Sequence, residues 1–269
     1  MTQGTLSGVD RIQARLQASR DEGRSALIPF VVSGRPTRER FLDTLRAVDA
    51  HADLIELGVP FSDPVADGPV IAEAARRALA EGVTLAEVLG DLETLELRSP
   101  TVLFSYLNPL LAGGLTNTME AAARAGVSGV VVPDLTLLAG NPEAEELDAC
   151  TRELGLAWIQ IVTPATGQDR RDEILRTARG FLYAALRTGI TGARTDEHDA
   201  AGFLASLRDR CPVPVCAGFG LRDVEQARVL REHADGLIVG TALVDAIERG
   251  DSPSSFLRPL FEAARRSTT

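Results

Sequence analysis

Apolar residues along this chain gather in short continuous runs, and eight such runs recur at regular spacing. They lie at 26–33, 53–59, 101–106, 129–135, 157–163, 180–186, 213–218 and 236–241. Runs in which consecutive positions are apolar, rather than every second one, are typical of strands that are buried on both faces of a sheet. The pattern therefore predicts eight buried strands.

Between these runs, apolar residues recur about every 3.6 positions, which is typical of amphipathic helices. Helices are expected over 37–50, 69–81, 84–97, 116–125, 143–154, 169–179, 199–210, 223–233 and 252–266. A further helix over 9–21, with Val9, Ile12 and Leu16 on one face, precedes the first strand. We expect that helix to cover one end of the structure that the strands form.

The alternation of strands and helices indicates parallel strands joined by right-handed crossovers. Eight such units close most naturally into a (β/α)8 TIM barrel, here an α/β fold with an extra N-terminal helix, and 269 residues is close to the roughly 250 of a typical barrel. A doubly wound sheet would want a nucleotide-binding fingerprint after its first strand, and Gly34-Arg35-Pro36 is not one. Because no low-complexity segment or linker interrupts the chain, we expect residues 1–269 to form a single domain.

Charge and residue usage narrow the possible functions. The net charge of −10 and the pI near 4.9 disfavour nucleic acid and anionic membranes as partners. No apolar run approaches the roughly 20 residues of a membrane span, and the N-terminus does not read as a signal peptide, so we expect a cytoplasmic protein. All 28 basic residues are Arg, which excludes Schiff-base and pyridoxal-phosphate mechanisms because both need a Lys amine.

Three carboxylates lie close together in the stretch 54–69: Glu56 inside an apolar run, then Asp63 and Asp67 in a loop rich in proline. Burial would raise the pKa of Glu56 toward the range of a general acid or base. Two alternatives remain at this point. A carboxylate could merely accept hydrogen bonds from nearby backbone N–H groups, or the two aspartates could chelate Mg²⁺, although the prolines around them disfavour a metal site.

Three glycine-containing loops follow the last three predicted strands. They are Gly189-Ile-Thr-Gly192, Gly218-Phe-Gly220 and Gly240-Thr241. In a barrel, such loops frequently hold a phosphate through backbone N–H groups, and Arg187 could add charge nearby. Tyr106 and Asn108 at the end of the third strand, with Tyr183 in the sixth, would lie on the same rim as the carboxylates. The combination suggests acid-base chemistry on a small phosphate ester.

These segments together resemble the tryptophan synthase alpha-subunit family. The resemblance rests on 54–69, on the three glycine loops, and on Ile28-Pro-Phe-Val-Val-Ser-Gly34, Asn108-Pro109, Val131-Val-Pro-Asp-Leu135 and Asp235-Gly-Leu-Ile-Val-Gly-Thr241. It covers the chain from about residue 9 to the C-terminus. It implies a lyase that cleaves indole-3-glycerol phosphate to indole and glyceraldehyde 3-phosphate without a metal or organic cofactor, in tryptophan biosynthesis, together with a beta subunit.

The resemblance also implies a role for each site residue. Glu56 would be the general acid and base, and Asp67 would hold the indole N–H. Tyr183 and Thr191 would support this pair, and the phosphate would bind at Gly192, Gly220, Gly240 and Thr241. Tyr106 and Asn108 are further supporting positions because of their expected place on the rim. Because the chain has no Lys to form a Schiff base, protonation of the indole ring would provide the electron sink for the cleavage.

Departures from the family pattern leave the biological context open. Arg35 stands where the family often has an acidic residue, and 136–142 separates Asp134-Leu135 from the acidic residues that follow. The loop after Asn108-Pro109 also differs at a surface like the one the family uses to contact its beta partner. Alternatives are therefore a standalone lyase that supplies free indole, a non-catalytic partner of a beta subunit, and a metal-dependent phosphosugar aldolase or isomerase.

Overall fold

The computed structural model describes residues 6–137, 140–186, 197–218 and 220–266. Its strands form one parallel sheet in the order β5-β4-β3-β2-β1-β9-β8-β7-β6. They are β1 (Ala26–Val32), β2 (Ile55–Gly58), β3 (Thr101–Phe104), β4 (Val127–Val131), β5 (Ala157–Ile159), β6 (Ile161–Val162), β7 (Leu182–Ala185), β8 (Val215–Gly218) and β9 (Gly236–Val239). Because β5 and β6 are consecutive parts of one stretch, the sheet closes into a barrel.

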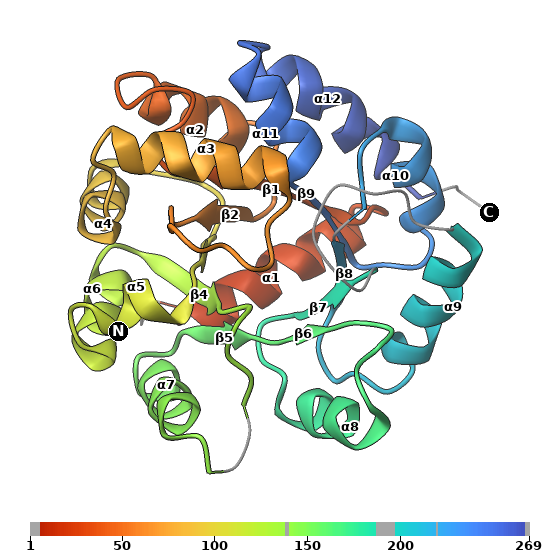
Figure 1. The fold of residues 1–269 in the computed structure, drawn as a ribbon. Coiled ribbons are helices and arrows are strands. Elements are labelled where there is room, and N and C mark those ends of the chain that lie inside the picture. Colours follow the sequence, from red (N-terminus) through yellow and green to blue (C-terminus); the bar gives the residue numbers. More distant parts are fainter. Residues whose placement is uncertain (1–5, 138–139, 187–196, 219, 267–269) are drawn as a thin grey trace, which may run out of the picture.

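Helices surround the ring of strands, as Figure 1 shows. They are α1 (Gly8–Asp21), α2 (Phe41–Asp49), α3 (Pro69–Ala80), α4 (Leu85–Thr94), α5 (Leu107–Leu111), α6 (Leu115–Arg124), α7 (Pro142–Glu153), α8 (Gln168–Thr177), α9 (Glu197–Arg208), α10 (Val224–Leu230), α11 (Thr241–Glu248) and α12 (Pro253–Ala263). The (β/α)8 fold expected from the sequence is confirmed. Within the described parts of the chain, we found no helix with both the length and the apolar character that crossing a bilayer requires.

Three details differ from the sequence prediction. The fifth predicted strand is divided at Gln160, a buried polar residue between β5 and β6. Helices α5 and α11 were not predicted. The first has only five residues and contains Pro109, and the second follows β9 directly, so that the apolar residues of both read as extensions of the preceding strands.

Helix α1 lies across the end of the barrel where the strands begin. The backbone N–H of Val9 donates to the carbonyl of Gly155 at 3.1 Å, and Arg11 Nη2 donates to the carbonyl of Gly126 at 2.9 Å. Gly126 immediately precedes β4, and one residue separates Gly155 from β5. The expectation that the first helix covers one end of the barrel is confirmed.

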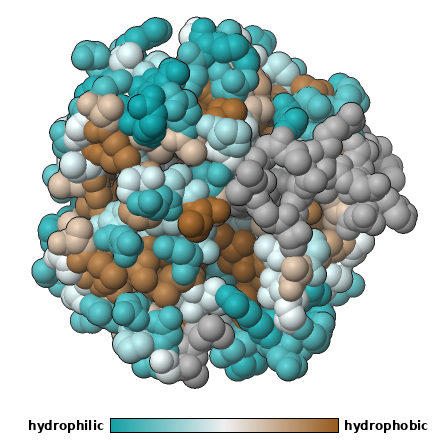
Figure 2. Space-filling view, viewed as in Figure 1, coloured by the Kyte–Doolittle hydropathy of each residue, from teal (hydrophilic) through white to brown (hydrophobic). Residues whose placement is uncertain are grey.

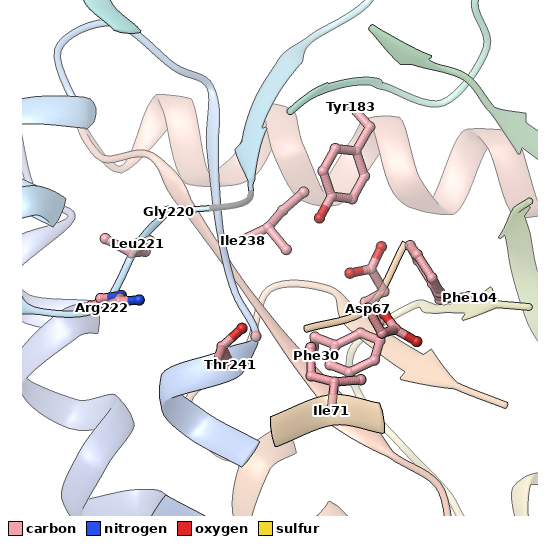
Figure 3. A pocket seen from close by; sticks show the side chains of 12 residues that line it. Phe30, Asp67, Ile71, Phe104, Tyr183, Gly220, Leu221, Arg222, Ile238 and Thr241 are labelled. Carbon is pink, nitrogen blue, oxygen red and sulfur yellow. The ribbon is translucent and has the colours of Figure 1, made fainter. Parts of the chain in front are cut away.

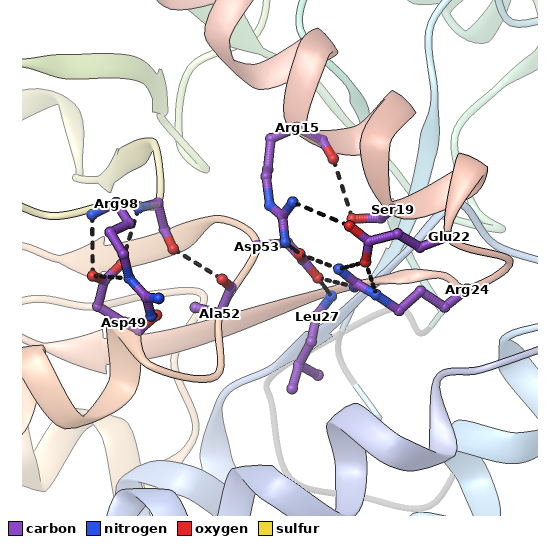
Figure 4. A network of polar contacts seen from close by, with 10 residues as sticks. Arg15, Ser19, Glu22, Arg24, Leu27, Asp49, Ala52, Asp53 and Arg98 are labelled. Atoms are coloured by element: carbon purple, nitrogen blue, oxygen red, sulfur yellow. Dashed lines mark hydrogen bonds and ion pairs between the residues drawn. The ribbon is translucent and has the colours of Figure 1, made fainter.

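A buried ion-pair cluster fastens this same end (Figure 4). Asp53, fully buried before β2, pairs with both Arg15 of α1 and Arg24 before β1. Its Oδ2 also accepts a hydrogen bond from the backbone N–H of Leu27 at 2.8 Å. A buried carboxylate is tolerated only when it is paired and hydrogen-bonded in this way. The opposite end, where the strands finish, is left for the functional site.

Candidate active site

A cavity lies among the C-terminal ends of the strands (Figure 3). In the view of Figure 1, hydrophilic side chains and exposed apolar patches alternate over the surface (Figure 2). The cavity is lined by Phe30, Glu56, Asp67, Ile71, Phe104, Tyr183, Gly220, Leu221, Arg222, Ile238, Gly240 and Thr241. Residues from both halves of the chain therefore converge on one space, as the barrel closure requires.

Glu56 occupies a position that water hardly reaches. It lies in β2, opposite Phe30 of β1 in the strand register, and is 2% exposed. Among the described residues, its Oε1 has no hydrogen-bond partner. Burial, and then the charge of Asp67, raises the pKa of Glu56 to about 8. At neutral pH this carboxyl group therefore carries a proton that it can donate.

Asp67 differs from Glu56 because it has a hydrogen-bonding partner. It is half-buried in the loop after β2, and the hydroxyl of Tyr106 donates to its carboxylate. The same hydroxyl accepts a hydrogen bond from the backbone N–H of Ala66 at 3.0 Å, which fixes the loop. Burial raises the pKa of Asp67 to about 6, and the Tyr106 hydrogen bond opposes that rise. Asp67 is therefore mostly ionised at neutral pH.

Two glycines make room for the aromatic walls of the cavity. A Cβ on Gly218 would lie 2.4 Å from Cε1 of Tyr183, and one on Gly58 would lie 2.5 Å from Cζ of Phe30. Burial, with the nearby charge of Glu56, raises the pKa of Tyr183 well above its usual value, so its hydroxyl stays protonated. In Figure 3 that hydroxyl points toward the interior of the cavity.

The opposite side of the cavity is formed by backbone and by one guanidinium. Gly240 is the N-cap of α11 and Thr241 its first residue, so unpaired N–H groups of the first turn face this region. Gly220 and Arg222 line the same side. In the described parts of the chain, the Arg222 guanidinium has no ion-pair partner. An anion entering here meets helix N–H dipoles and a positive charge.

Not every predicted site residue lines this cavity. Thr191 and Gly192, with Arg187, fall outside the described residues. Asn108 is exposed on α5, and among the described residues no hydrogen bond connects its side chain to the carboxylate pair. Asp63 is also exposed and accepts a hydrogen bond from its neighbour Ser62 at 2.5 Å. The grouping of all three carboxylates at one site is therefore reduced to Glu56 and Asp67, and the described residues hold no cluster of three or more His, Cys, Asp or Glu suited to a metal ion.

Sequence reasoning missed the apolar walls and Arg222. Phe30, Phe104 and Ile238 lie in strands whose residues are almost all buried, so nothing in the apolar pattern marks the members that face inward. Phe30 pairs with Glu56 in the parallel register, so the two side chains face the same side of the sheet. Extending the inward-facing positions from Glu56 to the neighbouring strand would therefore have identified Phe30. Arg222 lies two residues after Gly220, which belongs to a loop that the sequence predicted to bind phosphate. This proximity was the signal that could have identified Arg222.

Comparison with known protein families and sequences gives a consistent result. A family model described as tryptophan synthase alpha chain matches residues 16–267. The tryptophan synthase alpha chain of Xanthomonas campestris pv. campestris is 42% identical over 267 residues, which cover 94% of this chain and 97% of that protein. The corresponding protein of Synechococcus sp. is 45% identical over 238 residues, 87% of each chain.

Solved structures show the same likeness. A chain in a structure of Mycobacterium tuberculosis tryptophan synthase superimposes with a TM-score of 0.88 at 32% identity, covering 98% of this chain and 100% of that one. Tryptophan synthase subunit alpha from Legionella pneumophila gives 0.84 at 28% identity, covering 94% and 98%. Sequence and structure therefore agree over nearly the full length.

Proposed function

Since this chain belongs to the tryptophan synthase alpha chain family, we propose that it is the lyase that cleaves indole-3-glycerol phosphate into indole and glyceraldehyde 3-phosphate. The observation that supports this most is the pairing of a neutral Glu56 with an ionised Asp67 in one cavity. Environments that separate the pKa values of two carboxyl groups assign one to proton donation and the other to charge stabilisation. The reaction needs both.

The first step in the proposed mechanism is protonation of the indole carbon that bears the side chain. Glu56 gives its proton to that carbon, and positive charge develops on the ring nitrogen. The Asp67 carboxylate accepts a hydrogen bond from the ring N–H and stabilises this charge. A protonated ring can then receive the electron pair of the bond that breaks.

The second step returns the proton to Glu56. Its carboxylate removes the proton from the hydroxyl group on the adjacent side-chain carbon, and the carbon-carbon bond breaks as the aldehyde forms. The bonding electrons flow into the ring and neutralise it, so Glu56 ends as it began. Because the chain contains no Lys, we propose that ring protonation takes the place of a Schiff base, with no metal required.

The walls of the cavity suit the two ends of this substrate. Phe30, Phe104 and Ile71 provide apolar surface for the indole ring beside the carboxylates. Gly240, Thr241 and Gly220, with Arg222, provide N–H groups and positive charge for the phosphate. Tyr183 would hold its hydroxyl against the reacting groups, and Tyr106 would orient Asp67.

We further propose that the chain works as the alpha subunit of a complex with a beta subunit. The direct test incubates the purified chain with indole-3-glycerol phosphate, alone and with a cognate beta subunit, and measures indole. Release in both cases with strong activation by the partner is the expected result. Equal release in both would indicate a standalone lyase, and binding of the partner without any indole would indicate a non-catalytic subunit. Loss of activity in EDTA would contradict the metal-free mechanism.

A further inference from the structure

Helices α3 and α11 carry the two halves of the cavity at their inner ends. Asp67 immediately precedes Gly68, the N-cap of α3, and Gly240 is the N-cap of α11. The two helices pack against each other along the top of the view in Figure 1. They extend outward for about 18 and 12 Å at the usual rise of 1.5 Å per residue. A change in the relative position of the two helices would therefore move Asp67, at the inner end of α3, relative to the proposed phosphate site at the inner end of α11.

The outer ends of the same helices each carry a glutamate. Glu81 is the C-cap residue of α3, and Glu248 is the last residue of α11. Two carboxylates at the negative ends of adjacent helix dipoles are unfavourable unless a cation lies between them. That cation is Arg35, in the loop after β1.

Arg35 binds both glutamates while almost fully buried. Its Nε and Nη2 donate to the two carboxylate oxygens of Glu248 at 2.7 and 2.8 Å, and its Nη1 donates to Glu81 at 2.7 Å. The residue is 5% exposed. A two-pronged contact of this kind fixes orientation as well as distance, and a Lys cannot reproduce it.

A neighbouring arginine provides a natural comparison. Arg77 of α3 also reaches Glu248, with one hydrogen bond at 3.2 Å, but its side chain is 50% exposed, and its Nε donates to Glu73 of the same helix at 2.9 Å. Exposed ion pairs contribute little because water and salt screen them. The buried connection between the two helices is therefore the one that Arg35 makes.

We propose that Arg35 is a positioning residue that sets the distance between the acid-base pair and the phosphate site by joining the outer ends of α3 and α11. This inference rests on the proposed function. Helices move as rigid bodies, so releasing their outer ends shifts the inner ends. A displacement of about 1 Å at a reacting centre can lower the rate by roughly a hundredfold.

The test compares two substrates, indole-3-glycerol phosphate and its dephosphorylated form, with the wild type, Arg35→Ala and the matched control Arg77→Ala. All are assayed at 25 °C after circular dichroism shows that they are folded. For Arg35→Ala, kcat/KM on the phosphate ester should fall by roughly 10- to 100-fold, with a much smaller loss on the dephosphorylated substrate, which does not use the phosphate site. For Arg77→Ala, both should stay within about twofold of the wild type.

Equal losses on the two substrates, no loss in Arg35→Ala, or the same loss in Arg77→Ala would overturn the proposal. If Arg35→Ala does not fold, Glu248→Gln replaces it. That variant keeps the size of the side chain and one acceptor oxygen, and it should show the same selective loss; an unselective loss, or none, would again overturn the proposal. A wild type that cleaves neither substrate would contradict the proposed function instead.

Discussion

Two carboxyl groups in one cavity acquire opposite protonation states because their surroundings differ. Glu56 lies inside a strand, where its Oε1 has no hydrogen-bond partner among the described residues, and burial favours the neutral form. Asp67 lies in a loop, where the Tyr106 hydroxyl stabilises the charged form. The sequence indicated that these residues matter, since an acid within an apolar run is unfavourable without a use. It also predicted a raised pKa for Glu56, but it could not show that the Tyr106 hydroxyl keeps Asp67 charged.

This difference predicts a bell-shaped dependence of kcat/KM on pH. Activity requires Asp67 ionised, so it should fall as the pH drops through about 6, and it requires Glu56 protonated, so it should fall as the pH rises through about 8. The two limits belong to the interacting pair rather than to either residue alone. Initial rates at low substrate concentration provide the measurement. A rate that continues to rise above pH 9 would contradict Glu56 as the acid.

A second prediction at this scale concerns Arg222. Replacing it by Ala should raise KM for indole-3-glycerol phosphate by roughly tenfold with little change in kcat, because a charged hydrogen bond to the bound phosphate is lost. Arg228→Ala is the matched control, since Arg228 pairs with Glu225 on the outer surface of α10. Steady-state kinetics of both variants give the answer. Equal KM values in the two variants would place Arg222 outside the phosphate site.

Strands and helices determine where the site residues lie relative to one another. The strand pattern predicted all eight barrel strands because strands buried on both faces leave an uninterrupted apolar signal. It failed for α5 and α11, because a helix of five or eight residues after a strand has too few turns to show a period. The missing α11 matters most, since its N-terminus carries the N–H groups that we propose bind the phosphate. For the same reason Asn108, expected at the end of the third strand, lies in α5 instead.

Strand β8 yields a prediction about packing. Gly218→Ala places a Cβ 2.4 Å from the ring of Tyr183 and should push that ring into the cavity. We expect loss of most indole release and a destabilisation of about 1–3 kcal/mol from overpacking. Gly202→Ala on α9 is the control, because a Cβ there meets nothing within 4 Å. Thermal unfolding and activity assays would distinguish the two, and a fully active Gly218→Ala would show that the position of Tyr183 is unimportant.

The two ends of the barrel have different roles: contacts that stabilise the fold lie at one end, and the candidate active site lies at the other. At one end, α1 and the buried Arg24–Asp53 pair close the barrel. At the other, the described strands and loops leave an open cavity with unpaired N–H groups and a buried acid. The net charge of −10 repels anions as a whole, so the proposed phosphate ester would be attracted locally by the α11 N-terminus and Arg222. That residues 1–269 form a single domain stays a prediction.

The most direct test of the account measures indole release from indole-3-glycerol phosphate by the isolated chain and three single variants. Glu56→Gln and Asp67→Asn should each lose at least about a hundredfold in kcat, because each removes a group that acts in the transition state. Asp63→Asn, in the same loop but exposed, should keep nearly normal turnover. Near-normal indole release by either Glu56→Gln or Asp67→Asn, with folding verified, would contradict the central claim.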